Sequence, residues 1–342
     1  MDTGYALPIS VRFAEPWIED NKKFVDQVKN GYANTLNNIR DELRPRLQKA
    51  RLIKKVGDGE PFSLAAVDAS VVDVHIDDLA TVLVQAALYI DGETKFDVPK
   101  RFGPFTAEDA RFVRTPARVS REVAMLAEVP AVQTVIVDNS FWSFLMEVNQ
   151  AITAMHNRFG GDGEYSAITE NVVNGFVLMM ENPNAIAMPK SGVSQSLSKN
   201  PKFKDLFSVP IADRAVCTRV LEPGEALTPM SLKEVGSFGV EQRQFTPAQT
   251  KRIKEIYEKE IYFTYYKPWA YSRAYRIEAR KEKLTNDLFA SIKEATKFRE
   301  IAEPEPQFLV DYAVKQIGAV QQLYGGLNQF RVPFVGFHRT AR

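Results

Sequence analysis

The sequence predicts an α/β fold, in which short buried strands alternate with amphipathic helices. Two apolar runs, at 63–67 and 133–137, have the length and composition of strands buried inside a sheet. Several segments around them repeat apolar residues at intervals of three and four, the period of one helix face. Hydrophobic residues make up 45% and charged residues 25% of the 342 residues, which indicates a globular protein and excludes a disordered chain.

In the first half of the chain, helices are expected where apolar residues recur with the helical period, and strands where they run together between turn signals. Pro45 is expected to kink the first helix. Thr106 has the side chain of an N-cap for the second helix, and Asp91-Gly92 is a turn that ends the second strand. The expected elements are a helix over 17–55, strands over 63–67 and 79–90, a helix over 106–129 and a strand over 133–137. For 79–90 a helix is the alternative.

In the second half, a polar, Ser-rich loop over 189–200 separates two groups of elements. The group after this loop contains a hairpin around Pro268 and a helix with an aromatic and aliphatic face. The expected elements are helices over 141–158 and 168–180, a strand over 185–188, a helix over 247–260, strands over 262–266 and 270–279, and a helix over 306–324.

Composition excludes several classes of protein. Cys217 is the single cysteine, so no internal disulfide forms and no oxidising compartment is required. No apolar run reaches the roughly 18 residues of a membrane span, and the N-terminus lacks a signal-peptide pattern. We therefore expect a cytoplasmic protein. With 44 basic and 43 acidic residues the net charge is +1, so any nucleic-acid partner must be argued from local features.

Two strands each end in an aspartate that is followed, two residues later, by a serine. The first motif is LAAVDAS, with Asp68 and Ser70, and the second is VIVDNS, with Asp138 and Ser140. In α/β folds, ligands collect at the carboxyl ends of buried strands, and two carboxylates there can share divalent cations. The alternative is that each aspartate belongs to a turn or caps a helix.

A glutamate and a histidine are further candidates. Glu122 and Glu128 lie six residues apart on the helix between the two motifs, so they point to nearly opposite sides and only one is expected to face the aspartates. His338 lies in the apolar segment PFVGFH near the C-terminus. The alternatives are a solvated surface glutamate and a histidine on the surface or in packing.

The segment 251–283 combines basic and aromatic residues. It holds ten Lys or Arg and five Glu, a local net charge of +5, and eight aromatic residues are interleaved with them. Cations for phosphates and rings for base stacking are what a single-strand groove uses. The alternative is a strand pair whose aromatic side chains fill the core and whose charges are solvated.

The order of these features resembles a ribonuclease H-like nuclease core, and the sequence is similar to the NurA family of DNA-end-processing nucleases. The resemblance runs from about residue 60 to the end of the chain. Ala69 and Asn139 replace the glycines of the two Asp-Gly-Ser elements of the family, and Phe337 replaces a small residue, so the chain resembles a divergent member. The matching segments are 68–70, 121–122, 135–141, 187–191, 262–266, 275–278 and 332–338.

The resemblance implies a ribonuclease H-like mixed sheet flanked by helices, with an N-terminal helical extension and a C-terminal α+β extension. Residues 1–60 would form the helical extension and 61–342 a NurA-like nuclease domain, whose core over about 61–220 is completed by 240–342. It also implies a homodimer, a HerA-type hexameric ATPase as partner, and a role in DNA end resection or repair.

The resemblance further implies hydrolysis of single-stranded DNA and DNA ends by a two-metal mechanism, with two Mn²⁺ or Mg²⁺ ions in each active site. Asp68 would bridge the metals, Glu122 and Asp138 would complete their coordination, and His338 would bind a metal or donate a proton. Lys190 would hold a phosphate as a point charge. The candidate DNA-binding residues are Lys190, Ser191, Lys267, Arg273, Arg276, Tyr266 and Trp269.

Two other classes remain open. One is a catalytically weak or inactive partner that keeps the fold and binds DNA or a motor ATPase. The other is a different ribonuclease H-like enzyme, such as a resolvase or an RNA-strand nuclease. A phosphate-loop ATPase is disfavoured, because the sequence has no GxxxxGK[ST] motif.

Overall fold

The computed structural model describes residues 9–76, 79–160, 166–190, 197, 211–234, 239–240, 245–301 and 303–317. Within these ranges eleven strands form one sheet in the order β1-β8-β10-β11-β7-β6-β2-β3-β4, with β5 paired to β3 and β9 to β10. Strands β2, β6 and β7 are parallel to one another and the other pairs are antiparallel, so the sheet is mixed. The predicted α/β class is confirmed.

The strands have the following bounds: β1 Ile53–Lys55, β2 Leu64–Ile76, β3 Leu79–Ile90, β4 Glu93–Phe96, β5 Lys100–Thr106, β6 Thr134–Val137, β7 Ala185–Ala187, β8 Glu225–Leu227, β9 Met230–Ser231, β10 Ile261–Lys267 and β11 Tyr275–Arg280. The helices are α1 Ile9–Lys49, α2 Ala107–Leu126, α3 Phe141–Phe159, α4 Ser166–Glu181, α6 Asp213–Val220, α7 Pro247–Glu255, α8 Asn286–Ala295 and α9 Glu305–Lys315. Short helical turns are η1 Leu232–Glu234, η2 Ile256–Glu260 and η3 Lys281–Lys283.

The structure corrects several predicted bounds. The first helix continues through Pro45 and ends at Lys49, and η2, a π-helix, completes the segment expected as one helix over 247–260. The strand expected over 270–279 begins only at Tyr275, and the end of the helix expected over 306–324 lies outside the described residues.

The first strand is also longer than expected. It continues through Asp68 to Ile76, because SVVDVHI pairs residue by residue with β3. Asp68 is therefore inside β2 and not at its end, although its parallel pairing with β6 stops at Val67.

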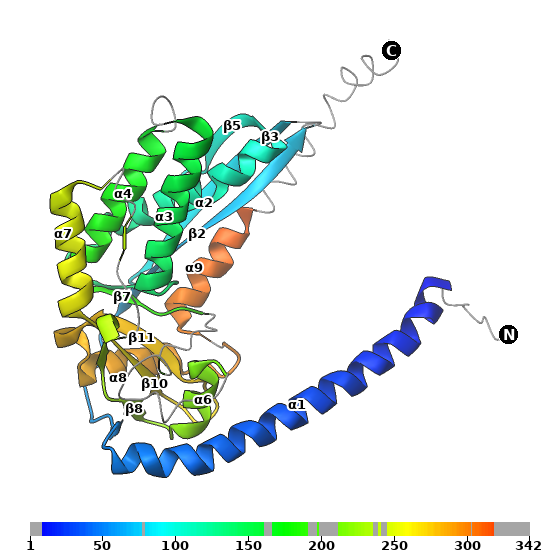
Figure 1. Ribbon diagram of the computed structural model, residues 1–342, viewed down its shortest axis with the longest axis vertical. Helices are drawn as coiled ribbons and strands as arrows, with labels where there is room; N and C mark the ends of the chain where they lie inside the picture. Colours follow the sequence, from blue (N-terminus) through cyan, green and yellow to red (C-terminus); the bar gives the residue numbers. More distant parts are fainter. Residues whose placement is uncertain are drawn as a thin grey trace.

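Helices cover both faces of the parallel strands. Successive side chains of a strand point to opposite faces. Accordingly, Ala65 and Val67 of β2 join the core cluster under α2, α3 and α4, whereas Leu64 and Ala66 join a second cluster with α8 and α9. Figure 1 shows α9 on the side of β2 away from α3. Strands buried on both faces read as continuous apolar runs, which explains the runs at 63–67 and 133–137.

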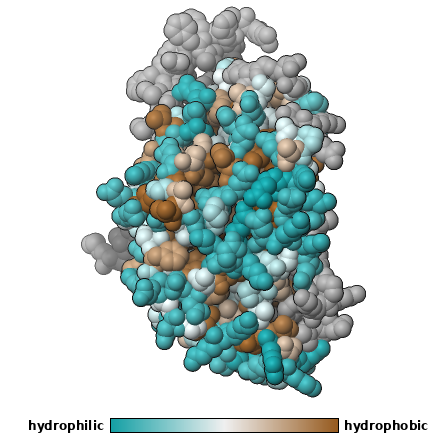
Figure 2. Space-filling view, turned by 90° about the vertical axis from the view of Figure 1, so that its left-hand side faces the viewer, coloured by the Kyte–Doolittle hydropathy of each residue, from teal (hydrophilic) through white to brown (hydrophobic). Residues whose placement is uncertain are grey.

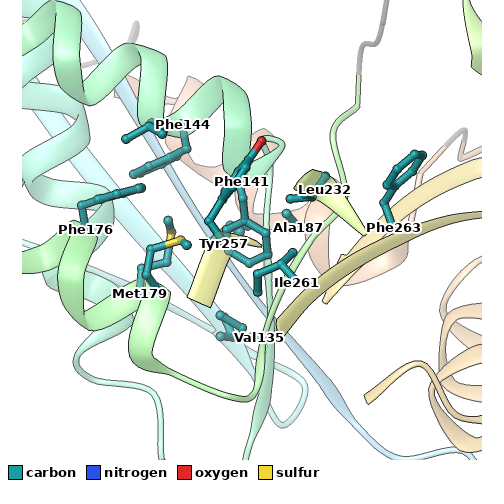
Figure 3. Close-up of a cluster of buried hydrophobic side chains, with 14 of the residues drawn as sticks. Val135, Phe141, Phe144, Phe176, Met179, Ala187, Leu232, Tyr257, Ile261 and Phe263 are labelled. Atoms are coloured by element: carbon teal, nitrogen blue, oxygen red, sulfur yellow. The ribbon is translucent and has the colours of Figure 1, made fainter. Parts of the chain in front are cut away.

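Aromatic side chains fill the main core between the helices and the sheet (Figure 3). Phe144 of α3 stacks on Phe176 of α4 with ring centroids 6.0 Å apart. Tyr257 of η2 and Phe141 at the start of α3 lie in the same cluster, beside Val135 of β6. The core therefore ties the elements that carry Asp138 to the helices that cover the sheet.

Helix α1 projects from the body of the molecule as a long arm (Figure 1). Its last turns are anchored, since Leu43 and Leu47 are buried and Arg44 pairs with Glu225 at 2.7 Å. Farther along the arm, Phe24 is 63% exposed. The strand that follows, β1, pairs with β8, so the segment before residue 60 is joined to the sheet.

The described surface is largely polar. Figure 2 shows a face that is mostly hydrophilic, with apolar side chains in small, scattered groups. None of the helices in the described ranges combines the length and apolar character that crossing a bilayer requires.

Candidate active site

Three central, parallel strands bring the main residues of the site together at the point where their parallel pairing ends. Val67 of β2 pairs with Val137 of β6, so the next residues, Asp68 and Asp138, lie side by side. Strand β7 pairs with β6 on its other side and leads to Lys190, whose backbone N–H donates to Asp138 Oδ1 at 3.0 Å. The carboxyl ends of neighbouring parallel strands are where α/β folds place ligands.

The Lys190 ammonium lies among four carboxylates. Its Nζ is 2.9 Å from Asp138 Oδ2, 3.1 Å from Asp311 Oδ1, 3.5 Å from Asp68 Oδ2 and 3.7 Å from Glu303 Oε2. Burial lowers the pKa of Lys190, but the charges of Asp138 and Asp68 outweigh that effect and the pKa lies above its ordinary value. Lys190 is therefore a fixed positive charge in an acidic cluster.

Glu122 reaches the same region from helix α2, which packs on β2 and β3. It is 1% exposed, and it accepts a hydrogen bond of 2.8 Å from Arg118 Nη1. Arg118 also donates to Glu147 Oε2 at 2.5 Å, so one guanidinium holds both glutamates. Glu128 lies beyond the end of α2 and is exposed, so Glu122 is the glutamate that faces the sheet.

The pKa values of four carboxyl groups at the site are raised, those of Asp68, Glu122, Asp138 and Glu303. Burial raises the pKa of Glu122 to about 8, against the opposing charge of Arg118, and the charges of Asp68 and Asp138 contribute to the rise. Burial also raises the pKa of Asp138 to about 6 and that of Asp68 above its ordinary value, although Lys190 opposes both. Burial therefore disfavours the charged form of these carboxyl groups, and the positive charges of Lys190 and Arg118 offset only part of that effect.

Four residues that contact the site belong to no motif that the sequence analysis identified. Glu303 and Asp311 contact Lys190 from the chain around α9, and Gln307 Nε2 donates to Asp138 Oδ1 at 2.7 Å. Arg214 Nη1 donates to the Lys190 carbonyl at 2.5 Å. The sequence offered one usable signal, because Gln307 and Asp311 are four residues apart in a predicted helix and therefore share a face.

The structure corrects the prediction that Tyr266 and Arg276 contact DNA. Tyr266 is 2% exposed and packs on Phe289 with ring centroids 4.9 Å apart. Arg276 is 7% exposed and donates to Glu278 Oε1 at 2.6 Å. Both side chains belong to the interior, because β10 and β11 are covered on both faces.

The other predicted DNA contacts lie nearer the surface. Trp269 stacks on Tyr271 at 5.9 Å, with Lys293 Nζ 4.9 Å from the Trp269 ring. Arg273 lies over the Tyr275 ring at 5.9 Å. Lys267 Nζ donates to the Thr218 carbonyl at 2.7 Å, which ties it to α6. Ser191 and His338 lie outside the described residues.

The donor chemistry of the cluster suits a divalent cation. Carboxylate oxygens are the ligands that Mg²⁺ and Mn²⁺ prefer, and a bound cation would favour the charged form of carboxyl groups whose pKa values burial raises. Within the described ranges, no three His, Cys, Asp or Glu side chains converge on one point that could hold a metal ion. Lys190 lies between the carboxylates instead.

No family model and no curated protein matches the sequence, but solved structures of NurA nucleases match the fold. The NurA nuclease from Sulfolobus solfataricus superposes with a TM-score of 0.57 at 12% identity, over 90% of this chain and 98% of that one. NurA with manganese gives 0.55 at 11% identity, over 90% and 98% of the two chains. NurA bound to dAMP and manganese gives 0.53 at 11%, over 86% and 93%. The chain therefore has a NurA-like nuclease fold.

Proposed function

We propose that this protein is a metal-dependent nuclease that hydrolyses phosphodiester bonds in DNA. The observation that carries the proposal is the convergence of Asp68, Asp138 and Lys190 where the parallel pairing of β2, β6 and β7 ends, with Glu122 buried beside them on α2. The NurA-like fold supports the same activity.

The residues that would hold metal are Asp68, Glu122 and Asp138, with His338 as a further ligand or a proton donor. The matching NurA structures that contain manganese support Mn²⁺, with Mg²⁺ as the alternative and two ions in each site. A divalent cation at this position supplies charge stabilisation to the phosphate and activates water. Its charge would also neutralise carboxylates whose pKa values are raised by burial.

The chain's own side chains then bind and orient the substrate. Lys190 keeps its positive charge and can hold a phosphate oxygen as a point charge. Arg118 fixes the orientation of Glu122 through the 2.8 Å hydrogen bond. Ser191, next to Lys190 in sequence, is proposed as a second phosphate contact.

We propose that DNA approaches the site along the stacked pair Trp269 and Tyr271. Tyr271 is 44% exposed, and a ring of this kind provides a stacking surface for an unpaired base. Arg273 and Lys267 lie nearby in sequence and supply cations for the phosphates. The neighbouring structure of NurA with dAMP is consistent with a nucleotide in this fold.

A homodimer and a HerA-type hexameric ATPase are proposed as partners, in the processing or repair of DNA ends. The supporting observation is the projecting arm of α1, on which Phe24 is 63% and Val25 41% exposed. Exposed apolar residues on an arm suit an interface. The single, buried Cys217 is consistent with a cytoplasmic location.

A catalytically weak DNA-binding partner of a motor ATPase is the second candidate. It is favoured by Ala69 and Asn139, which replace the glycines of the family motifs, and by the position of Lys190 among the carboxylates.

The test is a cleavage assay on single-stranded and blunt duplex DNA, in Mn²⁺ and in EDTA. We expect the wild-type protein to cleave in Mn²⁺ only, and Asp68→Ala to lose cleavage while its thermal melt stays intact. Asp58→Ala, at an exposed site, is the matched control. Full activity of Asp68→Ala would refute the nuclease assignment. DNA binding without cleavage by the wild-type protein would favour the second candidate.

A further inference from the structure

Gln307 of helix α9 connects the C-terminal part of the chain to Asp138. Its side chain is 2% exposed. The amide nitrogen Nε2 lies 2.7 Å from Asp138 Oδ1 and 2.7 Å from the Met188 carbonyl oxygen. Both amide hydrogens are therefore engaged, and burial leaves little water to replace either bond.

The orientation of this amide is determined by its neighbours. Both partners, a carboxylate oxygen and a carbonyl oxygen, are acceptors, so the nitrogen of Gln307 must face them and not its own oxygen. An amide turned the other way would place an acceptor against two acceptors and leave Met188 without its donor. The geometry thus requires a donor of this length at position 307.

The effect on Asp138 is to fix one of its two oxygens. Oδ1 accepts from Gln307 and also from the Lys190 backbone N–H at 3.0 Å. Oδ2 is left on the side of the acidic cluster, 2.9 Å from Lys190 Nζ. Two hydrogen bonds on one oxygen prevent the carboxylate from rotating, and they direct the second oxygen toward the cluster.

Helix α9 holds Gln307 firmly in place. The helix packs on β2 and β3, and its Val310 and Val314 are 0% and 1% exposed. Asp311, one turn after Gln307, contacts Lys190 Nζ at 3.1 Å from the same helix face. The helix therefore supplies two side chains to the site from a rigid support.

We propose that Gln307 is a positioning residue that holds Asp138 in the orientation needed to bind a divalent cation. This inference rests on the proposed nuclease function. A residue that merely satisfied the Met188 carbonyl would influence stability alone, whereas a positioning residue also changes metal affinity and turnover through Asp138.

The experiment compares Gln307→Met with Gln316→Met. Gln316 caps the end of the same helix but is exposed, and its amide donates to the Tyr312 carbonyl at 3.5 Å. Gln316→Met therefore makes the same chemical change away from the site. We expect Gln307→Met to lower kcat at least about tenfold, with KM for DNA within about twofold, and to weaken Mn²⁺ binding about fivefold or more, measured by electron paramagnetic resonance. Gln316→Met should match the wild-type protein in all three.

A second comparison shows whether the effect passes through Asp138. In an Asp138→Asn background, adding Gln307→Met should leave Mn²⁺ affinity unchanged, because the group that Gln307 orients is no longer a carboxylate. Gln307→Asn keeps the amide but is one methylene too short to reach Asp138, so it provides a milder variant if Gln307→Met does not fold, and the same losses are expected.

The outcomes separate this inference from the proposed function. If the wild-type protein cleaves DNA and Gln307→Met or Gln307→Asn matches Gln316→Met in kcat and Mn²⁺ affinity, the positioning role is refuted and the nuclease function stands. The role is likewise refuted if the Mn²⁺ effect is equally large without the Asp138 carboxylate. A wild-type protein that neither binds Mn²⁺ nor cleaves DNA overturns both.

Discussion

Asp138→Asn should stabilise the metal-free protein at pH 8 while abolishing cleavage. Burial raises the pKa of Asp138 from 3.8 to about 6, so ionising it in the folded state is unfavourable relative to the unfolded chain. A difference of this size corresponds to about 3 kcal/mol. Asparagine avoids this cost, because an amide of the same shape carries no charge.

The net gain should be smaller than this upper limit. The amide oxygen of the substitution would keep the hydrogen bonds from Lys190 N–H and Gln307, but its nitrogen would then face Lys190 Nζ, where Asp138 Oδ2 now lies at 2.9 Å. We therefore expect a gain of about 1–2 kcal/mol, which raises the melting temperature of a chain of this length by roughly 1–3 °C.

The dependence on pH gives the sign of the effect. Between pH 4 and pH 6 the folded Asp138 binds a proton more readily than the unfolded chain does, so this residue makes the free energy of unfolding fall as pH rises. The advantage of Asp138→Asn should thus be absent near pH 4 and complete above about pH 7.

The assay is thermal or urea unfolding in EDTA at pH 4, 6 and 8, with the exposed Asp58→Asn as control. Added Mn²⁺ should reverse the order, because the wild-type protein gains more from the cation. A variant less stable than the wild-type protein at pH 8 in EDTA would refute the reasoning.

Two further substitutions test the placement of single side chains. Glu122→Gln should abolish cleavage, and Glu128→Gln should leave it unchanged. The reason is that Glu122 is 1% exposed and lies beside the aspartates, whereas Glu128 is exposed. Loss of activity in the Glu128 variant alone would show that Glu122 is not the active-site glutamate. Arg276→Met should lower the free energy of unfolding by about 3–5 kcal/mol, since it leaves the charge of Glu278, which is 0% exposed, without its partner. Urea unfolding should show that adding Glu278→Gln recovers part of the loss; a double variant less stable than Arg276→Met would contradict this account.

The sequence predicted the parallel part of the sheet well. Asp68 and Asp138 directly follow the apolar residues LAAV and VIV, and such runs are typical of strands buried on both faces. The two aspartates lie close together because Val67 pairs with Val137, the residues that precede them. If the two strands are taken as parallel neighbours, the sequence pattern already implies this register.

Other parts of the site depend on contacts between distant segments. Gln307 and Asp311 reach the site only because α9 packs across β2 and β3, more than 200 residues away in the chain, and no local pattern specifies that packing. The burial of Tyr266 and Arg276 was missed for a related reason. All six residues of β11 are buried. The polar and charged residues of this strand therefore lie in the interior, although such residues usually indicate a face exposed to solvent.

The pairing of β11 with β7 and the docking of α9 on β2 have a consequence for synthesis on the ribosome. A nascent chain exposes Asp68 and Asp138 early, but β11 ends at Arg280 and α9 at Lys315, so Glu303, Gln307 and Asp311 emerge late. Until then the edge of β7 lacks its antiparallel neighbour, and Oδ1 of Asp138 lacks one of its two donors. A chain interrupted before α9 therefore carries an incomplete acidic site, and the cluster around Lys190 is completed only when synthesis has nearly ended.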